Sequence, residues 1–135
     1  MNQIIVPKDG LQFISEDGRV LLVIHPSEDK LGLFICNNQG TPVINMVASK
    51  DGGILGVADG RGKPVALMRP EKEGGHLVIF NNQDKVVARI LAHENGGGLI
   101  IFNNQEKIVE ILAVNKYGDG RLVITNNSGE VIFEK

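Results

Sequence analysis

A repeat of about 22 residues runs through the chain and constrains its fold more than any other feature. Five times in the chain, an apolar run that begins with Leu ends in an Asn-Asn or Asp-Gly step. The first residues of these steps are spaced 22, 22, 22 and 23 positions apart, at Asn37, Asp59, Asn81, Asn103 and Asn126. Repetition with this period indicates a tandem array of one small structural unit.

Six copies of the repeat fill residues 11–135, and they start near residues 11, 33, 55, 77, 99 and 122. Only the first ten residues stand outside the array. We expect them to cap it, with the apolar segment Ile4–Val6 pairing with the last strand or covering the first hairpin. A chain of 135 residues suits one domain with a core. The sequence therefore predicts a single β-repeat domain over residues 1–135, with a capping segment at 1–10.

Each copy has the pattern of a strand, a tight turn and a second strand. In the fourth copy, the β-branched and aromatic run Leu77–Phe80 precedes a polar turn at 81–85 and a second apolar run at 86–92. Four turns carry glycine where a type I turn with a G1 bulge requires positive φ. These glycines are Gly18, Gly40, Gly62 and Gly129. Asp84 and Glu106 take that position in the fourth and fifth copies, at a modest conformational cost.

The joints between copies are rich in glycine, as in residues 50–53 and 94–98, and are short enough to reverse the chain. The 17 glycines without a collagen period also indicate many turns. We therefore expect an all-β fold of six tandem hairpins, about twelve short antiparallel strands, closed and pseudo-symmetric through pairing of the terminal strands. The alternative is a parallel β-solenoid with one repeat per coil, in which the repeated Asn side chains stack as a ladder.

Alternation along the first strand of each copy separates two faces. One face is uniform between copies, as a shared core should be, and carries pairs such as Leu33 and Ile35. The other face is also largely apolar, so we expect another part of the chain or a second subunit to cover it. Its aromatic residues Phe34, Phe80 and Phe102 are the candidate interface, and the chain is expected to form a homo-oligomer.

Charge and cysteine usage narrow the class of protein. A net charge of −2 gives no electrostatic basis for binding phosphate backbones, so nucleic acid is not an expected partner. No apolar run approaches the length of a membrane span, and residues 1–10 do not resemble an export signal, so we expect no membrane partner and a cytoplasmic location by default. The single Cys36 aligns with Ala58, Phe80 and Phe102, which indicates a packing role.

No pattern in the sequence predicts a catalytic residue, a cofactor or a metal. Pairing of Asn81 with Val86 would place His76 opposite Leu91, with His93 a diagonal step away, but two histidines alone are weak grounds for a metal site. The turn residues Asp51, Asp59, Asp84 and Asp119 raise the question of calcium. Only Asp59 lies in the repeated register, whereas calcium β-rolls repeat the acid in every turn. The segment 60–63 resembles a phosphate loop but precedes no helix, and we interpret it as a turn.

The Asn-rich turns form the one repeated polar surface. Their candidate ligand-facing residues are Asn37, Asn38, Asn81, Asn82, Asn103, Asn104, Asn126 and Asn127. Exposed amides on one rim could bind glycans, although the chain offers no Trp and only Tyr117 as an aromatic platform. The alternative is that Asn tolerates left-handed geometry and caps its own turn.

The segments GGHLVIFNNQDKVVARI, GGGLIIFNNQEKIVEIL and VNKYGDGRLVITNNSGEV resemble a repeat of approximate form GG-x-x-x-V-F-N-N-Q-G-K in uncharacterised bacterial proteins. The resemblance covers residues 11–135 and implies hairpin repeats, without any activity, cofactor or catalytic residue. Our chain departs from it at Asp84 and Glu106, where the repeat prefers glycine.

Three functions are compatible with these patterns. The first is a non-enzymatic structural or protein-interaction scaffold that self-associates, and the second is a glycan-binding module that uses the Asn-rich turns. The third is an enzyme with a site between subunits, for which the sequence indicates no residues.

Overall fold

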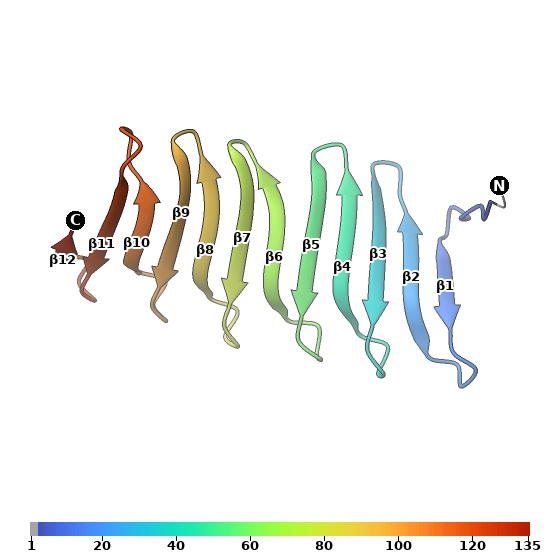
Figure 1. Cartoon of the computed structure of the whole chain (residues 1–135). Helices are drawn as coiled ribbons and strands as arrows, with labels where there is room; N and C mark the ends of the chain where they lie inside the picture. Colours follow the sequence, from blue (N-terminus) through green and yellow to red (C-terminus); the bar gives the residue numbers. More distant parts are fainter. Residues whose placement is uncertain (1–2) are drawn as a thin grey trace. The chain divides into compact units, whose positions relative to one another are not determined.

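The computed structural model describes residues 3–135 and is built from β-strands joined by short turns (Figure 1). The chain divides into two compact units, Met1–Pro64 and Val65–Lys135. No helix occurs within the described residues. The all-β class expected from the repeat is therefore confirmed.

The first unit holds five strands in sequence order. They are β1 (Leu11–Ile14), β2 (Val20–Pro26), β3 (Lys30–Cys36), β4 (Pro42–Ser49) and β5 (Gly52–Ala58). Each pairs with the next in antiparallel orientation. Pro42 begins β4, at a strand start where the missing N–H is tolerated.

The second unit continues the same pattern. Its strands are β6 (Pro64–Glu71), β7 (Gly74–Phe80), β8 (Val86–His93), β9 (Gly96–Phe102), β10 (Ile108–Val114), β11 (Gly120–Thr125) and β12 (Val131–Glu134). Successive strands again pair antiparallel, and His76 lies opposite Leu91 as the register predicted. Twelve antiparallel strands over residues 3–135 confirm the hairpin repeats, and the parallel solenoid is wrong.

The tight turns have the predicted bulged geometry. Positive φ angles occur at Gly18 (84°), Gly40 (76°), Gly62 (85°) and Gly129 (88°). Asp84 and Glu106 take the same conformation, with φ of 62° and 60°. They are the non-glycine residues with positive φ within the described chain. The turn position therefore imposes its backbone conformation whatever the side chain.

The expected closed, pseudo-symmetric arrangement is not found. Strand β1 pairs with β2 and β12 pairs with β11, and neither has a second strand partner among residues 3–135. Residues 3–10, before β1, contain a turn in which Gly10 N donates to Pro7 O, and they contain no strand. Ile4 and Ile5 are 80% and 86% exposed, so they neither pair with a strand nor cover the first hairpin. Residues 1 and 2 of the expected capping segment lie outside the described residues.

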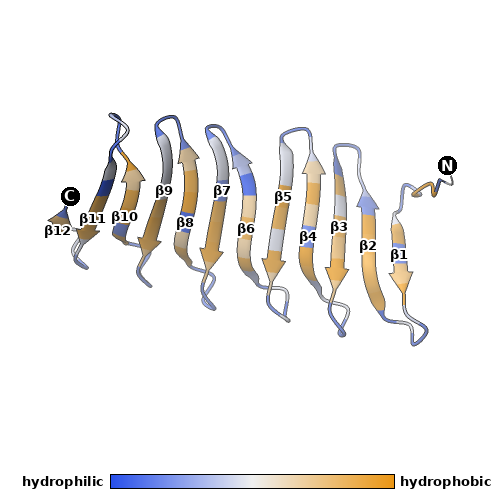
Figure 2. Ribbon diagram, viewed as in Figure 1, coloured by the Kyte–Doolittle hydropathy of each residue, from blue (hydrophilic) through white to orange (hydrophobic). Residues whose placement is uncertain are grey.

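The strand register assigns every side chain to one of two faces in each unit. We call the first the uniform face, because large apolar residues fill nearly all its paired positions. In the first unit it carries Leu11, Phe13, Leu22, Ile24, Leu33, Ile35, Ile44, Met46, Leu55 and Val57. In the second unit it carries Met68, Leu77, Ile79, Ala88, Ile90, Leu99, Ile101, Leu112, Leu122 and Ile124, together with Glu110. Figure 2 shows that hydrophobic colours gather on the strands and hydrophilic colours on the turns.

The opposite face, here the mixed face, carries apolar and polar residues. Its central row contains Val23, Phe34, Asn45 and Gly56 in the first unit, and Leu67, Val78, Arg89, Ile100, Ile111 and Val123 in the second. The buried apolar side chains of the described residues, Val78 (5% exposed) and Val123 (6% exposed), belong to this face. On the uniform face, Leu55 and Leu112 remain 40% and 50% exposed. The uniform face therefore does not form the covered core that the sequence predicted.

Candidate functional site

The repeated Asn residues hold their own turns together. Asn81 Oδ1 accepts hydrogen bonds from the backbone N–H groups of Gln83 (2.8 Å) and Lys85 (3.1 Å). The same pair of bonds recurs at Asn37, Asp59, Asn103, Asn115 and Asn126. The side-chain Oδ1 of the first turn residue thus caps its own turn. This was the alternative to glycan binding in the sequence analysis.

The amide nitrogens of these Asn side chains are engaged as well. Asn81 Nδ2 donates to Asn104 Oδ1 at 3.3 Å, and Asn103 Nδ2 donates to Asn127 Oδ1 at 3.3 Å. Asn37 Nδ2 donates to Gly60 O, and Asn126 Nδ2 donates to Glu130 Oε2. These bonds link successive turns or close one turn. Six of the eight predicted Asn residues take part in these hydrogen bonds. The other two, Asn38 and Asn82, are exposed.

The three candidate interface residues are half-buried within the chain. The ring of Phe34 lies over Gly32, where an added Cβ would stand 2.5 Å from the ring. Phe102 lies beneath the guanidinium of Arg89, with 5.2 Å between Arg89 Cζ and the ring centroid. Phe80 lines a cavity on the mixed face. All three lie on the mixed face, but each has neighbours within its own unit.

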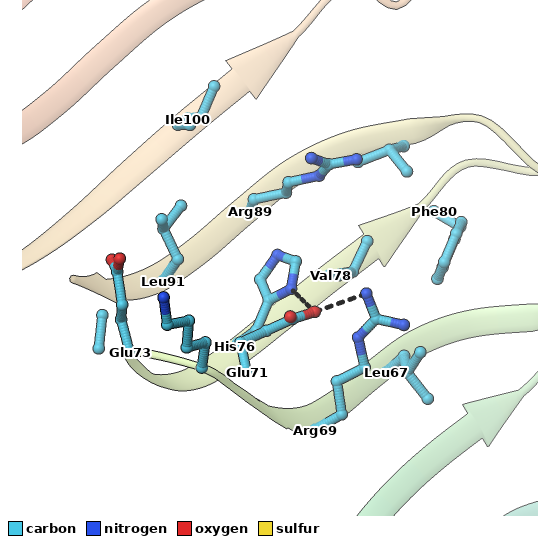
Figure 3. Close-up of a pocket in the computed structure, with 13 residues that line it drawn as sticks. Leu67, Arg69, Glu71, Glu73, His76, Val78, Phe80, Arg89, Leu91 and Ile100 are labelled. Carbon is cyan, nitrogen blue, oxygen red and sulfur yellow. Dashed lines mark hydrogen bonds and ion pairs between the residues drawn. The ribbon is translucent and has the colours of Figure 1, made fainter.

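The cavity lies on the mixed face of the second unit and has a volume of about 510 Å³ (Figure 3). Strands β6 to β9 and the turn after β6 supply its walls. Leu67, Val78, Phe80, Leu91 and Ile100 form the apolar part of the lining. This volume falls within the range of about 300–1,000 Å³ that is usual for small-molecule sites.

A charged cluster occupies one end of the cavity. Arg69 Nη2 lies 2.7 Å from Glu71 Oε1, and His76 Nδ1 lies 3.4 Å from the same oxygen (Figure 3). Cross-strand pairing of Arg69 with His76 places both side chains on one face beside Glu71. The hydrogen bond with His76, followed by the positive charge of Arg69, holds the pKa of the Glu71 carboxyl below its ordinary value. Glu71 is therefore an anion at neutral pH and a weak proton acceptor.

Arg89 is a further cationic group of the lining, in addition to Arg69 and Lys72. Its cross-strand neighbours are Val78 and Ile100, both apolar. Its Nε is buried and has no hydrogen-bond partner within the described residues.

The sequence prediction missed Arg69, Glu71 and Arg89. A partial signal was present, because Arg89 occupies a register in which Val23, Leu67 and Ile111 are apolar, although Asn45 and Glu134 are also polar.

The remaining chemical hypotheses receive little support from the geometry. No group of three His, Cys, Asp or Glu side chains suited to a metal occurs in the part of the chain that the structure describes. The cavity lining contains no Ser, Thr or Cys. Cys36 is a free, half-buried thiol at the end of β3. Across residues 3–135 there is also no helix with the length and apolarity needed to cross a membrane.

Comparison with known proteins gives no further identification. The sequence matches no model of a known protein family and none of the curated proteins. The resemblance to repeats of uncharacterised bacterial proteins therefore stays a prediction.

Proposed function

We propose that the protein is a non-enzymatic β-repeat scaffold that self-associates through the uniform faces of its units. The observation that carries the proposal is the accessible surface of the chain, which is 9660 Å² for a mass of 14.6 kDa. A compact folded monomer of that mass exposes roughly 6,900 Å². Two separate bodies of half the mass would expose roughly 8,300 Å² in total. The surface in excess of the second figure is about 1,300 Å², more than the ~800 Å² that each partner buries in a standard interface.

The composition of the uniform face supports burial against another apolar surface. Met46 and Leu55 of the first unit are 42% and 40% exposed, and Ile90 and Leu112 of the second are 53% and 50% exposed. At its paired positions, the uniform face of the first unit carries no charged residue within the described strands. Contiguous exposed apolar surface of this kind marks interaction sites in soluble proteins.

A second copy of the chain is the partner that fits this surface. Two sheets pack face to face about 10 Å apart when both inner faces are apolar, and a two-fold axis lets one such patch serve both partners. The small net charge of −2 opposes association only weakly. Association also explains why all six copies keep apolar residues on the uniform face, although neither unit covers its own uniform face.

The test is the solution mass of the protein, measured by light scattering behind a sizing column over a wide range of concentration. We expect multiples of 14.6 kDa. Met46→Lys places a charge on the uniform face and should shift the mass towards the monomer. Ile54→Lys is the matched control, since Ile54 is 36% exposed on the mixed face, and it should leave the mass unchanged. A monomeric wild type at every concentration would overturn the proposal.

The sequence-based interface is tested in the same series. Phe34→Ser and Phe102→Ser should weaken assembly only if the mixed face is the contact surface. Dissociation of these variants together with an assembled Met46→Lys would assign the interface to the mixed face instead. Glycan binding through the Asn-rich turns stays a second prediction, and retention of the wild type on a sugar column, lost in the double variant Asn81→Ala and Asn103→Ala, would support it.

A further inference from the structure

We propose that the cavity on the mixed face of the second unit binds a small organic monocarboxylate with an apolar body, and that Arg89 holds its carboxylate. This site lies on the face opposite to the proposed association surface of the same unit. It is therefore a further function, which does not depend on self-association.

The size and lining of the cavity define the body of the ligand. Its volume of about 510 Å³ accommodates a molecule of roughly ten to fifteen non-hydrogen atoms with room for water, within the range usual for ligand sites. The apolar side chains of Leu67, Val78 and Leu91 line it from three neighbouring strands. Such walls favour a hydrocarbon chain or ring, because the contact removes apolar surface of both partners from water.

The charge of the cavity defines the head group. The positive charge of Arg69 is already matched by Glu71, whose carboxylate lies 2.7 Å away. Arg89 has no ion pair within the described residues, its buried Nε has no hydrogen-bond partner there, and its guanidinium lies over the ring of Phe102. An aromatic ring attracts a guanidinium but offers none of the oxygen acceptors that its five N–H groups can use. A half-buried guanidinium without a counter-charge is a ready partner for an anion.

The geometry of a guanidinium favours a carboxylate, which can accept two parallel hydrogen bonds from it. The lining holds three cationic groups, Arg69, Lys72 and Arg89, and the two carboxylates of Glu71 and Glu73, so its formal charge of +1 matches one negative charge on the ligand. A ligand with one negative charge is therefore preferred over a dianion such as an alkyl phosphate. The side chain of His76, only 11% exposed, lines the cavity beside Glu71.

The experiment is a titration of the isotope-labelled full chain followed by amide chemical shifts. The probes are octanoate, octyl phosphate, octanol and octylammonium, each below the concentration at which it forms micelles. Octanoate should shift the amides of Val78, Arg89 and Ile100 saturably, and the other three probes should bind at least about tenfold more weakly, as expected for the loss of one charge-assisted pair. Equal affinity for octanol would assign the site to apolar contact alone and overturn the proposal, and so would tighter binding of octyl phosphate.

Variants test the role of Arg89. Arg89→Leu should weaken octanoate binding at least about tenfold, and Arg89→Lys should weaken it less, because an ammonium keeps the charge but not the two-pronged geometry. Arg121→Leu is the matched control, since Arg121 lies on the same face but is paired with Glu134 at 2.7 Å. Dispersed amide spectra establish that each variant is folded. Unchanged octanoate affinity in Arg89→Leu or Arg89→Lys, or equal loss in Arg121→Leu, would overturn the assignment.

Discussion

Replacing Glu106 by glycine should make the protein more stable. Glu106 has φ of 60° in a turn where its N–H donates to Asn103 O at 2.9 Å. Holding a residue with a Cβ in the left-handed region costs about 1–2 kcal/mol. Glycine removes that strain but adds about 0.4–1 kcal/mol of conformational entropy to the unfolded chain. The expected net gain for Glu106→Gly is therefore about 0.5–1 kcal/mol.

The reverse substitution should have the opposite sign. Gly129 has φ of 88° in the corresponding turn, and an added Cβ there would meet no atom within 4 Å. Gly129→Ala therefore adds backbone strain without a steric clash, and it should lower the free energy of unfolding by about 0.5–1 kcal/mol. Gln105→Gly is a control within the same turn as Glu106. Gln105 is not among the positive-φ residues, so glycine there should only destabilise, through the entropy of the unfolded chain.

The assay is urea unfolding followed by circular dichroism at one fixed protein concentration, because self-association couples stability to concentration. A shift of the midpoint at constant slope reports the change in stability. A lower midpoint for Glu106→Gly, or a higher one for Gly129→Ala, would refute the reasoning. Either result would show that side-chain contacts of the turn outweigh the backbone strain.

Three further predictions follow from the turns. Asn103→Ala should cost about 1 kcal/mol of stability in urea unfolding, because two backbone N–H groups lose their acceptor, whereas Asn103→Asp should keep most of it. The pKa of the Asp59 carboxyl lies below its ordinary value of 3.8, first because of its hydrogen bond with Arg61. The ionised carboxylate therefore stabilises the fold above pH 3.8, and this contribution is lost as the pH falls through the lowered pKa. Thermal unfolding of Asp59→Asn should accordingly depend less on pH in acid than that of the wild type, and equal slopes would contradict this. Gly74→Ala should lower the free energy of unfolding by about 1–3 kcal/mol in the same urea assay, more than Gly129→Ala does. The reason is that φ is 147° and the new Cβ would stand 2.6 Å from Ala92 Cβ. A loss no larger than that of Gly129→Ala would show that the backbone moves to relieve the clash.

Local chemistry allowed much of the fold to be predicted. The turn position that requires positive φ was identified from Gly40 and its equivalents, and Asp84 and Glu106 adopt it although neither is glycine. The register that follows from this turn correctly placed His76 opposite Leu91. Turn geometry fixes the pairing of the flanking strands, so residues close in sequence suffice for these predictions.

The candidate cavity could not be predicted in the same way. Arg69, Glu71 and His76 meet because β6 and β7 pair in a particular register, and Arg89 joins them from β8. In the sequence these residues looked like ordinary charged or polar positions within strands. Arg89 departs from the apolar residues Val23, Leu67 and Ile111 of its register, but which groups become partners depends on contacts across three strands.

The sequence by itself determined the repeat, the hairpins, the turn geometry and the alternation of side chains between two faces, because each depends on interactions within about 22 residues. Only the tertiary structure decided that β1 and β12 have no second strand partner among residues 3–135, and that Leu55 and Leu112 remain exposed while Val78 is buried. An alternating strand has the same pattern whether its apolar face is covered or open. Coverage is set by contacts between distant segments or between molecules, and those contacts leave no periodic trace in the chain.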